Sequence, residues 1–180
     1  MLENFHKNSM KLVLSAKKRA KKPIRRSVCP LDILLAFFEI EDETKNFLIN
    51  LGLSEEKILN TYEEINTKYP KTKEPFSKEV IKIFLSSLKI INKNKEEQIC
   101  PIHLLSAIFD EQDPILKELF NKLKLNEKEI TNTLYKKIKK SKQIASFVEY
   151  KVFNNYSKTV SRKNALKQQY FFLLKLFRKI

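Results

Sequence analysis

The spacing of hydrophobic and polar residues predicts a helix at the start of the chain. Over residues 4–20 the apolar positions recur every three to four residues, which is the period of a helix with one buried face. The residues expected on that face are Phe5, Ser9, Leu12, Val13, Ala16 and Ala20. The same period continues after a basic turn, so further helices are expected downstream.

Three more helices are predicted before a polar linker at 68–75. The second begins at Cys29-Pro30, where the missing N–H of proline is tolerated in the first turn. The third should end at Gly52, the only glycine, in a left-handed conformation. The fourth should begin at Ser54, whose hydroxyl can cap it. Their expected inward residues are Ile33, Leu34, Phe37, Phe38, Phe47, Leu48, Leu51, Ile58, Leu59, Tyr62 and Ile65.

The pattern then starts again 71 positions later. Phe76 matches Phe5, and the segment Cys-Pro-Leu-Asp-Ile-Leu-Leu-Ala-Phe-Phe at 29–38 returns as Cys-Pro-Ile-His-Leu-Leu-Ser-Ala-Ile-Phe at 100–109. The only two cysteines of the chain occupy the same point of the two copies. The last helix of the unit returns at an offset of 72, and a loop absorbs the additional residue.

This duplication predicts an all-α fold, a pseudo-twofold tandem repeat of two four-helix units, about eight helices, with a C-terminal helical extension. One glycine and six prolines leave little turn chemistry for β-hairpins. The expected domain is 1–138, with repeats at 4–67 and 76–138 joined by the linker 68–75, and the extension is 139–180. Each repeat is too small to close a good core alone, so the two should pack together.

The net charge of +15 is concentrated in the extension. Residues 139–180 hold 11 basic residues and one acid, Glu149. A helix expected near 161–177 mixes this charge with apolar residues that could contact a partner: Tyr170, Phe171, Phe172, Leu174 and Phe177. Such a helix could pack on the repeats, bind an acidic partner or lie on a membrane surface. Nucleic acid is a weaker alternative, because no recognised binding module accompanies these residues.

No group of residues predicts a catalytic site, a metal site or a cofactor. His6 and His103 are the only histidines, and they lie on different repeats without the cysteine or carboxylate spacing of a zinc site. His103 is expected to be a packed or capping residue. Cys29 and Cys100 stand at helix starts, which can lower a thiol pKa, but a role as small N-cap residues is the plainer interpretation.

The tandem repeat and its Cys-Pro helices resemble the Clp amino-terminal domain of the ClpB/ClpC family of AAA+ unfoldases. His103-Leu104-Leu105 fits the family motif, whereas Asp32 replaces the histidine in the first copy. The resemblance implies a non-catalytic module that binds unfolded clients or adaptors for a Clp ATPase, or docks on the Clp protease core. With one glycine these 180 residues cannot contain the phosphate loop of an ATPase. Two interpretations stay open: a free-standing domain of the kind that some plastids use, or the amino-terminal part of a larger Clp unfoldase.

The resemblance also implies a peptide groove between the start of the first helix and the second-repeat helix. Motif matching places His6, Ile102 and His103 there, with Leu31 as the first-repeat counterpart. Phosphoarginine binding, known in some relatives, is not expected, because Leu31 and Ile102 stand where acidic residues would be needed. The competing hypothesis is a basic protein that binds nucleic acid or a membrane surface through 139–180.

The amino-acid composition indicates in which cellular compartment the protein works. Abundant Lys, Asn, Ile and Phe suggest coding by an AT-rich genome, and two cysteines make no disulfide framework. The plastid or apicoplast stroma is therefore the expected location, with the cytoplasm of an AT-rich bacterium as the alternative.

Overall fold

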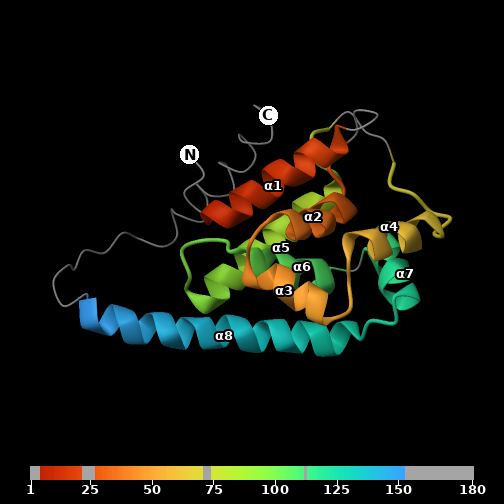
Figure 1. Ribbon diagram of the computed structural model, residues 1–180. Coiled ribbons are helices and arrows are strands. Elements are labelled where there is room, and N and C mark those ends of the chain that lie inside the picture. Colours follow the sequence, from red (N-terminus) through yellow and green to blue (C-terminus); the bar gives the residue numbers. More distant parts are fainter. Residues whose placement is uncertain (1–4, 22–26, 71–73, 112, 153–180) are drawn as a thin grey trace. The chain divides into compact units, whose positions relative to one another are not determined.

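The computed structural model describes residues 5–21, 27–70, 74–111 and 113–152, with side chains up to residue 140 (Figure 1). The helices of these residues are α1 (Lys7–Ala20), α2 (Pro30–Ala36), the 3-10 turn η1 (Phe37–Glu39), α3 (Glu43–Asn50), α4 (Glu55–Glu63), α5 (Lys78–Asn94), α6 (Pro101–Asp110), α7 (Pro114–Lys122) and α8 (Glu127–Val152). The predicted all-α fold with four helices in each repeat is confirmed for this part of the chain. None of these helices is long and apolar enough to cross a bilayer.

The helix boundaries follow the predicted capping residues. The Ser54 hydroxyl accepts a hydrogen bond from the backbone N–H of Lys57 (3.1 Å) at the start of α4. Gly52, just after α3, has φ 73°, as predicted, and Lys124 takes the same left-handed conformation (φ 55°) at the equivalent point of the second repeat. The predicted domain limits stay a prediction, and α8 passes residue 138 without a break.

Two reciprocal backbone pairings join the repeats. Phe5 pairs with Ile99, and Val28 pairs with Phe76, each as a short parallel bridge. The N–H of His6 donates to the carbonyl of Ile99 (3.0 Å), and the residue after Phe76 donates to the carbonyl of Val28 (2.9 Å). The segment before the first helix of each repeat therefore lies against the segment before the second helix of the other. The predicted pseudo-twofold symmetry is visible in these hydrogen bonds.

Helices α2 and α6 form the centre of the core. Each contacts the other, and each also contacts both α1 and α5. All of α2 is buried, and so is nearly all of α6. The sequence predicted one buried face for these helices, but they are covered on every side because they lie between the repeats. Within these two helices only Ile102 and Asp110, near the two ends of α6, are not buried.

Candidate functional site: two equivalent helix junctions

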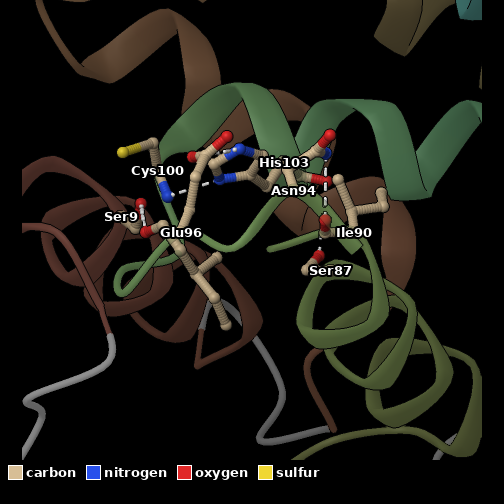
Figure 2. A network of polar contacts seen from close by, with 8 residues as sticks. Ser9, Ser87, Ile90, Asn94, Glu96, Cys100 and His103 are labelled. Atoms are coloured by element: carbon tan, nitrogen blue, oxygen red, sulfur yellow. Dashed lines mark hydrogen bonds and ion pairs between the residues drawn. The ribbon is translucent and has the colours of Figure 1, made fainter. Parts of the chain in front are cut away.

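His103 and Asp32 have the same structural role at the starts of α6 and α2. Each is the third residue of its helix, and its side chain accepts a hydrogen bond from the backbone N–H of the cysteine that precedes the helix. The Cys29 N–H donates to Asp32 Oδ2 (2.9 Å), and the Cys100 N–H donates to His103 Nδ1 (3.0 Å; Figure 2). The predicted capping role of His103 is confirmed, and Asp32 replaces the motif histidine as an equivalent acceptor.

The ring of His103 is neutral. Its Nδ1 accepts the Cys100 N–H, so its Nε2 carries the hydrogen and donates to Glu96 Oε2, 3.0 Å away (Figure 2). The Glu96 carboxylate favours a protonated ring, but a protonated ring could not accept the Cys100 N–H. The side chain is 1% exposed, and its burial lowers the pKa of His103 to about 4. His103 is therefore a structural residue that a ligand cannot reach directly.

His6 and Ile102, two predicted site residues, lie at the starts of α1 and α6, which a backbone hydrogen bond brings together. His6 caps α1, and its backbone N–H donates to the carbonyl of Ile99, which also accepts the Ser9 hydroxyl at 2.6 Å. The side chains of His6, Cys100 and Ile102 are all half-buried. We call this place the α1/α6 junction: His6, Cys100 and Ile102, together with Asp42 and Glu96.

Two carboxylates border the α1/α6 junction. Asp42 caps α3, and its Oδ2 accepts a hydrogen bond from Asn8 Nδ2 (3.1 Å), which ties α3 to the first turn of α1. Burial, followed by the charges of Glu96 and Asp42, raises the pKa of Cys100 to about 11. Cys100 is consequently a neutral thiol and a poor nucleophile at neutral pH. The α1/α6 junction is a half-buried, partly apolar surface with an acidic border, which is suited to binding rather than to chemistry.

The pseudo-twofold symmetry generates a second junction where α5 and α2 begin. Its members include Cys29, Leu31 and Asp113, each 71 positions from its counterpart Cys100, Ile102 or Asp42. In this α5/α2 junction the three side chains are only 3%, 4% and 6% exposed. Leu31, a predicted groove residue, is therefore inaccessible, whereas its counterpart is half-exposed.

A linker tyrosine closes the α5/α2 junction. The hydroxyl of Tyr69 donates to Asp113 Oδ1 at 2.7 Å, and its ring stacks on Tyr62, 6.3 Å between centroids. Burial raises the pKa of Tyr69, and the neighbouring charges of Asp113 and Cys29 add to this rise. The sequence predicts only a polar linker at 68–75, and its one sign of this contact is a tyrosine among polar residues and prolines.

The structure gives no contacts for the predicted partner-binding residues of the tail. The tail residues Tyr170, Phe171, Phe172, Leu174 and Phe177 lie outside the described residues. In the part of the chain that is described, no three His, Cys, Asp or Glu side chains are grouped as metal ligands would be. Peptide binding by His6, Leu31, Ile102 and His103 stays a prediction, of which the structure leaves His6 and Ile102 accessible.

Known protein structures share this architecture, although no family model and no curated protein matches the sequence. The N-terminal domain of the caseinolytic protease-associated chaperone ClpD from Arabidopsis thaliana is 17% identical, with a TM-score of 0.63 over 77% of this chain and 97% of that chain. A structure from a malarial protein secretion system is 19% identical, with a TM-score of 0.59 over 76% and 96%. The Hsp104 N-terminal domain from Candida albicans is 20% identical, with a TM-score of 0.58 over 73% and 89%.

These similarities include nearly the full length of each solved domain and the larger part of this chain. The chain has the fold of a Clp amino-terminal domain.

Proposed function

We propose that the double repeat is a non-catalytic protein-binding module of the Clp system, which captures unfolded clients or adaptors for an AAA+ unfoldase or its protease. The Clp amino-terminal fold supports the class of function. The observation that carries the proposal is the α1/α6 junction, where Ile102 and His6 stay half-exposed while the equivalent Leu31 is buried. A partly exposed apolar side chain such as Ile102 can bind apolar side chains of an extended segment.

The test is a binding titration of the full chain with a reduced, alkylated and therefore permanently unfolded model protein. Ile102→Glu should weaken this binding at least tenfold, because it replaces the half-exposed apolar side chain of the junction by a charge, two residues from Cys100, which lies near Asp42 and Glu96. The fold should survive. Ile102 is the second residue of α6, where a carboxylate suits the positive end of the helix dipole, and its side chain can reach water.

Leu14→Glu is the matched control. Leu14 is 57% exposed on the outer face of α1, so the substitution adds the same charge outside the junction. The control should bind as the unaltered chain does. Retained binding by Ile102→Glu would refute the assignment of the site, and no binding by the unaltered chain would refute the proposed function.

A location in the plastid or apicoplast stroma is also proposed, supported by the amino-acid composition alone. The alternative function through 139–180 has no described geometry to favour it. It predicts that removal of 139–180 abolishes all binding, whereas the proposed function predicts that client binding persists.

A further inference from the structure

The two junctions differ in the exposure of their equivalent side chains, which their shared sequence pattern does not predict. In each, a cysteine precedes a helix, an apolar residue follows the proline, and an aspartate caps a neighbouring helix. At the α5/α2 junction these three residues are buried, and Tyr69 donates its hydroxyl to the aspartate. At the α1/α6 junction they are half-exposed. The chain therefore contains one buried and one half-exposed copy of the same junction.

The path of the chain after the fourth helix of each repeat explains this difference. After α4 ends at Glu63, the chain turns back toward α5 and places Tyr69 against Asp113 on the way. The second repeat has no such turn at the equivalent point, because α8 continues as a helix to Val152. The linker therefore supplies Tyr69 to the α5/α2 junction, and the described side chains of α8 supply no equivalent residue to the α1/α6 junction.

We propose that the α1/α6 junction binds a tyrosine of an extended client segment, whose hydroxyl donates to Asp42 as that of Tyr69 donates to Asp113. This inference rests on the proposed function and specifies its ligand. Tyr69 precedes Pro70, which favours an extended backbone, so the ligand segment is extended too. Asp42 Oδ1, the oxygen that corresponds to the one Tyr69 contacts in Asp113, already accepts from the backbone N–H and the hydroxyl of Thr44. The phenol would therefore donate to Asp42 Oδ2, which accepts from Asn8 and has a second lone pair.

The acidic border adds a preference for basic neighbours. Asp42 and Glu96 both stand beside Cys100, so a lysine next to the tyrosine is attracted and a glutamate is repelled. In the linker Lys68 precedes Tyr69, but its ammonium contacts the Tyr62 ring and the carbonyls of Tyr62 and Glu63. The preference for a lysine therefore rests on Asp42 and Glu96. Unfolded clients that present lysine-tyrosine pairs are the expected ligands, ahead of segments with only aliphatic side chains.

The experiment uses a fluorescently labelled peptide that copies residues 65–70 of this chain, Ile-Asn-Thr-Lys-Tyr-Pro, titrated with the full-length protein. Replacing its tyrosine by phenylalanine should weaken binding about tenfold, because a hydrogen bond to a carboxylate is lost. The matched protein variant is Asp42→Ser. Serine keeps the helix cap but is too short to accept the phenol. With this variant the tyrosine and phenylalanine peptides should bind equally.

Equal binding of the two peptides to the unaltered protein would overturn the proposal, and so would a tyrosine preference that survives Asp42→Ser. Binding that appears only after Tyr156→Ala and Tyr170→Ala would identify the chain's own tail as the occupant and also overturn it. If the unfolded model protein still binds and Ile102→Glu still weakens that binding, the proposed function stands while the tyrosine preference fails.

Discussion

Neither repeat should keep its helices when the chain is divided within the linker. Val28, Phe76 and Ile99 are at most 3% exposed, and each lies in a pairing between the repeats. Burial of a large apolar side chain contributes about 1.5–3 kcal/mol. Exposing these three would cost about 5–9 kcal/mol, which is comparable to the whole stability of a typical domain, about 5–15 kcal/mol. The contacts of α2 with α6 would be lost as well.

The measurement is far-ultraviolet circular dichroism of the fragments 1–72 and 73–180, first alone and then mixed. Each fragment alone should have little helix and no cooperative melting transition, and the mixture should regain both. The control is the full chain with a protease site inserted after residue 72 and cut once the protein has folded, which should stay associated. A single fragment that melts cooperatively would show that the repeats are independent domains.

The two-repeat architecture could be predicted from the sequence. The duplication has kept the apolar positions and the helix-capping residues at the same places in both repeats. Gly52 and Ser54 mark the ends of helices through conformations and hydrogen bonds that lie within a few residues of them. The Cys-Pro segments could be placed at helix starts for the same reason. These predictions depend on local interactions, which a sequence pattern records directly.

The difference between the two junctions could not be predicted in this way. Leu31 and Ile102 are apolar residues at equivalent positions, yet only Ile102 is accessible. Their difference in exposure accompanies the contact between Tyr69 and Asp113, which are 44 positions apart. A shared motif indicates the local backbone geometry, but the burial of its side chains also depends on segments that are distant in the sequence. The sequence showed that Asp32 replaces the motif histidine in the first copy, and the structure shows that its carboxylate accepts the same hydrogen bond.

The domain should lose about 3 kcal/mol of stability through His103 when the pH falls from 7 to below 4. The folded pKa of about 4 lies below the ordinary value of 6.5. Between these two values the unfolded chain binds more protons than the folded one, so acid favours unfolding. A difference of about 2.5 pKa units corresponds to about 3 kcal/mol. Protonation would also remove the acceptor of the Cys100 N–H and so weaken the start of α6.

The measurement compares urea unfolding of the unaltered chain and of His103→Asn at several values between pH 7 and pH 4. Asparagine supplies an oxygen acceptor for the Cys100 N–H, as the carboxylate of Asp32 does for Cys29, but does not titrate. The variant should be less stable at pH 7, because it fills the buried site less well. Its stability should nevertheless fall less steeply toward acid. Since both proteins contain the same carboxylates, the difference between the two slopes isolates His103. Parallel slopes would mean that the buried ring is not the group that makes this fold sensitive to acid.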